Sequence, residues 1–327
     1  MISVVSGTNG FIGSRLVEAL LSQGHEVRAL TRSPNAPAPA GTTPFPVDFA
    51  RPDRILASGA LEGADYVFHV AGVTRALTID AFREGNVTPL RSLMSALETA
   101  EAPLRRLTLV SSQAAAGPAR GPGLPVDETM PPSPFEIYGQ SKYEAERLLQ
   151  DQTGRLPYTI IRPSAVYGPR DQDFLVLFKQ LRRGAGLYPA NKSSRIATIH
   201  VDDLIQGMLR ATFEDAGRDE VFFLTHEEDV GWREVYAGMA RAMDRPLRFE
   251  LEIPRLFVRA AGAFGDLASR VSGRLSLVNS HKVSLGLSPY WTCSAEKARR
   301  LVRFTPSVPL NEGLAATYRW YREHGWL

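Results

Sequence analysis

The 327-residue chain has a single cysteine, Cys293, and lacks the features that mark several protein classes. One cysteine cannot form an internal disulfide, and no Cys/His cluster has metal-ligand spacing, so we expect no metal. No run of five or six like charges accompanies the net charge of +3, which argues against a nucleic-acid partner. No uncharged stretch reaches the length of a membrane-spanning helix, so we expect no integral membrane segment.

The chain begins with "MISVVSG", which has neither the basic region nor the apolar core of an export signal. We therefore expect a cytoplasmic protein. With 44% hydrophobic and 22% charged residues, the chain has enough apolar material for a large core. Its length suits one large domain or two linked ones.

Three glycines near the amino terminus follow an apolar run at residues 2–5 that is typical of a buried strand. Helically spaced apolar residues come next and end at Gly24. In this setting Gly7 permits a tight turn, Gly10 lets the backbone approach a pyrophosphate, and Gly13 allows close helix packing. The anion would lie at the helix N-terminus. The stretch predicts a dinucleotide site made of Gly7, Thr8, Asn9, Gly10, Phe11, Ile12 and Gly13.

A second expected strand, residues 26–32, ends without the acidic residue that would bind the adenine ribose of NAD. Arg32 stands there instead, and its guanidinium could pair with a 2′-phosphate. The sequence therefore favours NADP as the cofactor, with NAD as the alternative.

The strand pattern recurs at 43–49, 64–74 and 104–117, and a helix is expected at 83–100. This alternation indicates an α/β fold with a Rossmann-type, doubly wound parallel sheet. Ligands of such sheets lie beyond the carboxyl ends of the strands. These segments supply further candidate cofactor-binding residues: Asp48, Phe49, Val70, Ala71, Gly72, Asn86 and Ser111.

Six motifs follow one another along the chain: "SGTNGFIG", "VFHVAG", "LVSSQAAAG", "YGQSK", "IIRPSAVYGPRD" and "IHVDDL". Together they resemble an extended short-chain dehydrogenase/reductase of the NAD(P)-dependent epimerase/dehydratase family. The resemblance covers residues 1–210 well. The ending, residues 293–327, is similar to the hydroxysteroid-dehydrogenase and dihydroflavonol-reductase branch.

The resemblance implies a division of the chain into two parts. Residues 1–168 would form the NAD(P)-binding domain, rejoined by about 196–225. A smaller, mostly carboxy-terminal α/β lobe would bind the substrate, from residues 169–195 and 226–327. Family dimers commonly pair through the helix carrying "YGQSK" and its neighbour, so a homodimer is an expectation by analogy.

The family also implies the catalytic residues Ser112, Tyr138 and Lys142. Tyr138 would be the general acid/base. Lys142, four residues later on the same helix face, would lower its pKa and bind the nicotinamide ribose. Ser112 would hold the substrate oxygen, with Ser111 as the competing candidate. The loop after the sixth strand would cover the nicotinamide with Pro163, Ala165 and Val166.

Departures from the family pattern bear on the reaction. Gln113 and Ala114 stand where dehydratases carry an acidic pair, and Ser164 replaces an asparagine usual in nucleotide-sugar epimerases. We therefore expect an oxidoreductase that transfers hydride between nicotinamide and a ketone or secondary alcohol on an apolar, steroid-like or aromatic small molecule. A nucleotide-sugar epimerase is the alternative. A non-catalytic dinucleotide sensor is a third interpretation, and the intact Ser-Tyr-Lys set argues against it.

Two further segments have alternative interpretations. Residues 251–278 carry apolar residues at helical spacing with arginines between them. A helix packed on its own lobe is favoured, and contact with a membrane surface is the alternative. Asp202 and Asp203 are expected to cap and anchor the following helix rather than to bind a metal.

Overall fold

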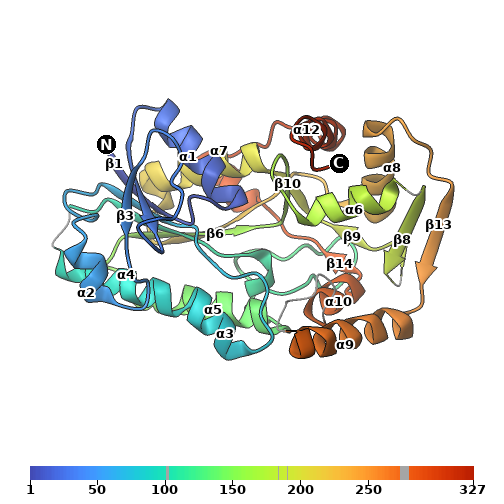
Figure 1. The fold of residues 1–327 in the computed structure, drawn as a ribbon, viewed down its shortest axis with the longest axis horizontal. Coiled ribbons are helices and arrows are strands. Elements are labelled where there is room, and N and C mark those ends of the chain that lie inside the picture. Colours follow the sequence, from blue (N-terminus) through green and yellow to red (C-terminus); the bar gives the residue numbers. More distant parts are fainter. Residues whose placement is uncertain (101–102, 183, 190, 273–279) are drawn as a thin grey trace.

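The main sheet of the protein is built from seven parallel strands. A computed structural model describes residues 1–100, 103–182, 184–189, 191–272 and 280–327. The strand order is β11-β6-β5-β4-β1-β2-β3, so the order reverses at β1 (Figure 1). This confirms the predicted Rossmann-type sheet, whose ligands lie at such a reversal. The strands are β1 (Ile2–Ser6), β2 (Glu26–Thr31), β3 (Thr43–Pro46), β4 (Tyr66–His69), β5 (Arg106–Val110), β6 (Tyr158–Pro163) and β11 (Glu220–Leu224).

Helices cover both faces of this sheet, as Figure 1 shows. One face packs against α1 (Phe11–Ser22), α7 (Val201–Phe213) and α11 (Glu296–Val302). The other packs against α2 (Pro52–Ala57), α4 (Thr88–Thr99) and α5 (Ile137–Gln150), with α3 (Ile79–Asn86) beside α5. Every residue of β5 and β6 is buried, because both faces of the central strands are covered.

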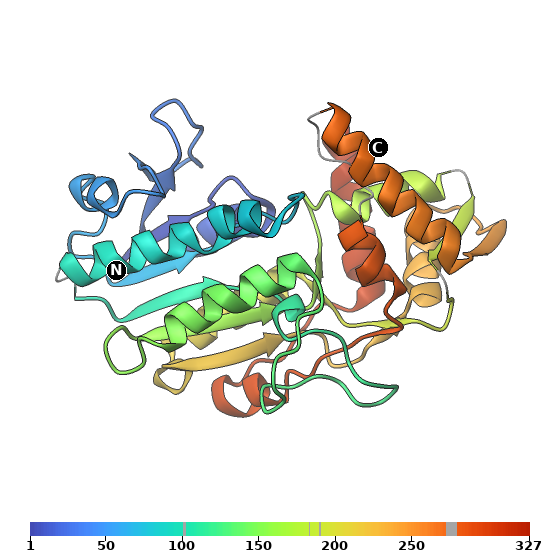
Figure 2. The same cartoon turned by 90° about the horizontal axis from the view of Figure 1, so that it is seen from below.

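The carboxy-terminal lobe lies beyond the carboxyl ends of the strands (Figure 2). It has its own core of aromatic and aliphatic side chains, among them Tyr167, Phe178 and Tyr188. Its small sheets pair β7 with β10, β8 with β13, and β9 with β12 and β14. The bounds are β7 (Ala165–Tyr167), β8 (Ala185–Pro189), β9 (Arg195–Ile196), β10 (Thr198–His200), β12 (Val230–Gly231), β13 (Phe249–Ile253), β14 (Tyr290–Trp291), α6 (Asp173–Leu181), α8 (Trp232–Ala242), α9 (Arg255–Ser272), α10 (Ser280–Leu287) and α12 (Leu310–Glu323). We propose the division into two parts given above, with two changes: β7 and β10 join the lobe, and α11 returns to the main sheet.

The helix predicted over 83–100 is wrong as one continuous element. The structure has α3 up to Asn86 and α4 from Thr88. Pro89 explains the break, because proline has no backbone N–H and is tolerated in the first turn of a helix but not in its interior.

The aspartate pair in the first turn of α7 anchors other segments instead of capping that helix. His200 is the N-cap residue, and its side chain accepts from the backbone N–H of Asp202. Asp203 accepts three hydrogen bonds from Ser307 and Val308, which fix the carboxy-terminal chain. The predicted anchoring is therefore present, and the predicted capping is wrong.

A buried ion pair joins α5 to the centre of the sheet. Arg162 on β6 and Glu146 on α5 lie 2.6 Å apart, with side chains 4% and 0% exposed. The Ser111 hydroxyl, just after β5, donates to the same carboxylate at 2.5 Å. The Arg162 guanidinium also stands over the ring of Phe223, from β11. Three elements thus meet at one carboxylate, and β11 contacts its partner Arg162.

Replacing Glu146 with alanine should lower the free energy of unfolding by about 3–5 kcal/mol, because it leaves the buried guanidinium of Arg162 without its counter-charge. Urea denaturation measures this. The matched control on α5 is Glu144→Ala, whose ion pair with Arg83 is largely exposed. That control should cost about 1 kcal/mol or less. Equal losses for the two variants would contradict the importance of the buried pair.

Candidate active site

The glycine turn after β1 leaves the N-terminus of α1 open. Gly7 has a φ of +78°, which side chains rarely permit. A Cβ on Gly13 would come within 2.0 Å of the Gly7 carbonyl oxygen, so this glycine permits α1 to pack on the turn. Gly10 is exposed at the N-cap of α1. The turn therefore has the shape of an anion cradle at a helix N-terminus.

Predicted residues of the adenine end lie beyond the neighbouring strands. Arg32 follows β2 and is exposed, and Asp48 follows β3 and accepts from the backbone N–H of Ala50. Asn9 donates from its amide to the Pro37 carbonyl, which ties the glycine turn to the loop after β2. Because β1, β2 and β3 are parallel neighbours, these groups share one edge of the sheet.

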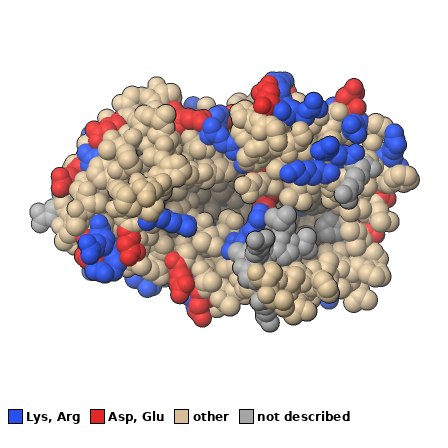
Figure 3. Space-filling view, viewed as in Figure 1, with Lys and Arg blue, Asp and Glu red and all other residues tan. Residues whose placement is uncertain are grey.

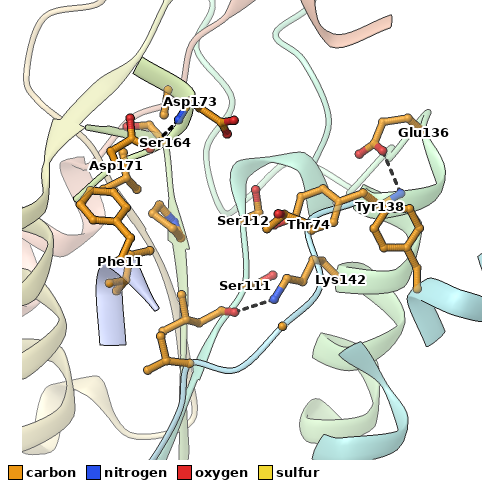
Figure 4. A pocket seen from close by; sticks show the side chains of 18 residues that line it. Phe11, Thr74, Ser111, Ser112, Glu136, Tyr138, Lys142, Ser164, Asp171 and Asp173 are labelled. Carbon is orange, nitrogen blue, oxygen red and sulfur yellow. Dashed lines mark hydrogen bonds between the residues drawn. The ribbon is translucent and has the colours of Figure 1, made fainter. Parts of the chain in front are cut away.

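A cavity of about 370 Å³ continues from the glycine turn along the carboxyl ends of the strands (Figure 4). The structure brings most of the predicted residues to it. They come from α1, α5 and the segments after β4, β5 and β6: Phe11, Ile12, Val70, Gly72, Ser111, Ser112, Tyr138, Lys142, Pro163, Ala165 and Val166.

Tyr138 is placed by the start of α5. The buried Glu136 carboxylate caps this helix and accepts from the N–H groups of Tyr138 at 2.8 Å and Gly139 at 2.5 Å. A Cβ on Gly139 would lie 2.3 Å from the Ala114 carbonyl oxygen, so α5 presses directly on the turn after Ser112. Close packing therefore brings Tyr138 within hydrogen-bonding reach of Ser112.

The two adjacent serines have different partners. The Ser111 hydroxyl donates to the buried Glu146 carboxylate. The Ser112 hydroxyl accepts from the backbone N–H of Ala114 at 3.1 Å, and its proximity to Tyr138 lowers the pKa of that phenol. This geometry favours Ser112 over Ser111 as the residue that faces a substrate oxygen.

The side chains of Lys142 and Asn86 lie against Gly72. The Lys142 ammonium donates to the Val110 carbonyl at 3.0 Å, and a Cβ on Gly72 would lie 3.0 Å from that nitrogen. The Asn86 amide makes three hydrogen bonds within the protein: it donates to the Val73 carbonyl and the Ser141 hydroxyl, and it accepts from the Val73 N–H. Asn86 thus holds the loop after β4 on α5, which is a positioning role, and its cofactor contact stays a prediction.

The protonation states differ from the expected pattern. Burial raises the pKa of Tyr138 to about 12, and the Ser112 hydrogen bond offsets only part of that rise. Burial lowers the pKa of Lys142 to about 8, against the raising effect of Glu146. Lys142 is not among the causes of the Tyr138 shift, and the predicted lowering of that pKa, which also involves an oxidised nicotinamide, stays a prediction. A phenol that stays protonated at neutral pH suits donation of a proton.

A second cavity, of about 450 Å³, adjoins the first on the side of the carboxy-terminal lobe. The two share six lining residues, among them Ser112 and Tyr138. The remaining lining is largely apolar and comes mostly from the lobe: Gln113, Ala114, Phe174, Val176, Leu177, Ile196, Trp232, Gly286 and Trp291.

Sequence reasoning missed the residues that complete this region. Asp173 and Ser164 line both cavities, and Thr74 lines the first, near Ser112 in Figure 4. Trp232 and Trp291 come from segments with no recognised motif. Only the loop "IIRPSAVYGPRD" gave a signal, because it includes Ser164 and runs close to Asp173.

Similar proteins are known for the whole chain. Residues 3–222 match the NAD dependent epimerase/dehydratase family. The chain belongs to this family. The ceramide reductase of Caulobacter vibrioides is 30% identical over an alignment of 336 residues, covering 100% of this chain and 96% of that protein. A 4-hydroxy-2-methyl-3-oxo-4-farnesyl-3,4-dihydroquinoline-1-oxide ketoreductase of Stigmatella aurantiaca is 29% identical, covering 97% and 95%.

Among solved structures, MoeE5 in complex with UDP-glucose and NAD has the same fold, with a TM-score of 0.78 at 23% identity over 99% of each chain. The family and the fold are those predicted from the sequence. Membership in this family, with relatives that are reductases, confirms the predicted oxidoreductase enzyme. It also confirms dependence on a nicotinamide dinucleotide, NAD or NADP.

The described ranges lack two features that would suggest other functions. None of the helices there is long and apolar enough to cross a bilayer. Likewise, the residues that the structure describes contain no group of three or more His, Cys, Asp or Glu side chains arranged to hold a metal ion.

Proposed function

We propose that this enzyme reduces a ketone on an apolar, long-chain or ring-bearing substrate, with NADPH as the preferred hydride donor. The observation that carries the proposal is the meeting of the two cavities at Ser112 and Tyr138. One leads to the glycine turn, and the other is lined by apolar side chains of the lobe. A carbonyl at their junction would have hydrogen-bonding groups on one side and room for an apolar body on the other.

The residues at the strand ends fit a bound dinucleotide. The cradle formed by Gly7, Gly10 and Gly13 would hold the pyrophosphate, and Arg32 would pair with a 2′-phosphate. The nicotinamide end would lie against Val70, Gly72, Pro163, Ala165 and Val166. When bound, the cofactor supplies or accepts hydride.

The side chains of the protein then supply position and the proton. Ser112 would donate to the substrate oxygen and orient the carbonyl carbon toward the cofactor cavity. In reduction Tyr138 would give its proton to that oxygen as the alcohol forms, and it would recover a proton from solvent. The Lys142 ammonium would favour the phenolate left on Tyr138.

The lining of the second cavity supports an apolar substrate. Asp173 is the one charged residue among the described residues that line it. Asp173 pairs with Arg75 at 2.9 Å, and the described lining includes no lysine or arginine to bind a sugar diphosphate, which opposes the epimerase alternative, although proteins of this fold bind UDP-glucose. The two relatives named above act, by their names, on a ceramide and on a farnesylated quinoline. We infer a substrate of similar apolar character.

The direct test is loss of reduced-nicotinamide absorbance on mixing enzyme, NADPH and a panel of long-chain and aromatic ketones. Turnover of one ketone class would support the reductase. If no ketone reacts and a UDP-hexose is interconverted, the enzyme is an epimerase.

Tyr138→Phe should lower kcat for ketone reduction by about 10²–10⁴-fold, because the substrate oxygen loses its proton donor. Cofactor affinity, measured by nucleotide fluorescence, should stay within a factor of two or so, since the ring remains. Tyr143→Phe, on the same helix, is the control and should keep its activity. Retained turnover in Tyr138→Phe would contradict this mechanism.

Arg32→Ala should raise KM for NADPH by about 10–100-fold, the usual effect of losing a hydrogen bond to a charged group. KM for NADH should hardly change, because NADH has no 2′-phosphate. The control is Arg54→Ala, a second exposed arginine in this part of the sheet domain. A parallel rise in both KM values would assign Arg32 a structural role and leave NAD as the cofactor.

The pH profile of kcat/KM for reduction should fall as pH rises through about 8, the pKa of Lys142. The sign follows because the ammonium exists below this value and is lost above it, while the Tyr138 phenol stays protonated to about 12. Lys142→Met should be less active and lack this inflection. An unchanged inflection in Lys142→Met would show that another group titrates.

A further inference from the structure

The helix α9 has its small residues inside and its large apolar residues outside. Val258, Gly262, Gly265 and Ser269 recur along one face and are buried. A Cβ on Gly262 would lie 2.8 Å from the Val283 side chain, so this face packs closely on α10. The opposite face carries exposed side chains: Leu256 (75%), Phe257 (66%), Phe264 (74%), Leu267 (56%) and Val271 (82%).

This arrangement overturns the interpretation favoured from the sequence, in which the apolar face of 251–278 packs on its own lobe. Residues 273–278 lie outside the described residues. For the helix itself, the apolar face is the one that the protein leaves uncovered. The order is the reverse of an ordinary surface helix, whose large apolar side chains face the core.

The exposed face is bordered by positive charge. Arg255 and Arg259 are one turn apart on α9, and the spacing puts Arg259 beside Leu256. Both arginines are exposed, and neither makes an ion pair with any residue that the structure describes. The described acidic residue of α9, Asp266, accepts from the backbone N–H of Ser280 and so faces α10.

The helix lies along the lower edge of Figure 1 and toward the reader in Figure 2, at the periphery of the molecule. The surface over it, at the lower right of Figure 3, is mostly without charge. Its 18 residues give an apolar strip about 27 Å long. A strip of this kind, on one outer edge and beside cationic residues, matches helices that lie in the plane of a bilayer surface.

We propose that α9 is an interfacial helix that docks this enzyme on a bilayer containing anionic phospholipids. The exposed leucine and phenylalanine side chains would enter the acyl region, and Arg255 and Arg259 would contact the phosphates. A second copy of the chain is a poorer occupant, because pairing through this face would offer Arg255 and Arg259 no acidic partner among the described residues of α9.

The docked face would lie close to the substrate cavity. Gly286, on α10, lines the second cavity, and α10 packs against α9. Docking would therefore bring that cavity near the lipid, from which an apolar ketone could enter. This delivery step rests on the proposed function, whereas the docking itself rests on α9 alone.

Co-sedimentation of the full-length protein with vesicles tests the docking. Vesicles of an equimolar phosphatidylglycerol and phosphatidylcholine mixture should bind the protein, and added salt should weaken binding. In the variant Phe257→Gln/Phe264→Gln/Leu267→Gln, the partition coefficient should fall by about tenfold or more, because three apolar side chains no longer enter the lipid. Arg255→Gln/Arg259→Gln should lose about tenfold on the mixed vesicles and little on pure phosphatidylcholine.

Matched controls change equally exposed residues elsewhere. Leu124→Gln removes another side chain that is 60% exposed, and Arg120→Gln/Arg300→Gln removes two exposed arginines. Both should bind vesicles as the wild type does. All variants should keep kcat/KM for a short, water-soluble ketone, whereas the α9 variants should lose turnover of a ketone carried in vesicles.

The outcomes separate the two proposals. If the wild type binds no vesicle, or if the Leu124 control loses as much as the α9 variant, the docking is overturned whatever ketones are reduced. A wild-type dimer that the α9 variant dissociates, without vesicle binding, would assign this face to a second copy. Vesicle binding through α9 without reduction of any ketone would uphold the docking and overturn the proposed reductase.

Discussion

The active-site geometry depends on one buried carboxylate. Glu146 holds α5 to the sheet through Arg162 and the Ser111 hydroxyl, and all three side chains are buried. A buried charge of this kind is tolerated only when its partners stay in place, so the helix has little freedom to slide along the sheet. Lys142 and Tyr138 lie about one and two turns earlier on α5, so the same contacts fix their positions along the sheet. The sheet thus positions two side chains that it does not carry.

Close backbone approaches bring the remaining groups to the same place. Gly13 lets α1 press on the turn after β1, and Gly139 lets α5 press on the turn after Ser112. Each contact needs a residue without a Cβ, because the nearest backbone oxygen stands within 2.3 Å of where that atom would be. One contact shapes the cradle for the cofactor, and the other brings Tyr138 to Ser112. Close backbone contact at a glycine therefore shapes both the cradle and the surroundings of Ser112.

Local sequence patterns were sufficient to predict the secondary structure of the amino-terminal half. The glycine turn, the strand alternation and the "YGQSK" helix are short-range signals, and the structure has all three. Contacts between residues far apart in the sequence could not be predicted. Nothing near Glu146 in the sequence indicates Arg162 as its partner, and Asp173 and Trp291 reach the second cavity only through the folding of the lobe. The helix break at Pro89 was a local signal that should have been used.

Helix α9 shows why periodicity alone misjudged the lobe. The spacing of its apolar residues predicts an amphipathic helix, and the helix is there. Periodicity does not say which face meets the protein. That depends on α10, whose close approach at Gly262 selects the face of small residues and leaves the phenylalanines outside. The exposed apolar face of α9 is unfavourable in water, and contact with an apolar surface would remove it from water. For the proposed reduction of an apolar ketone, a lipid bilayer would supply such a surface beside the cavity that Trp232, Trp291 and Leu177 line.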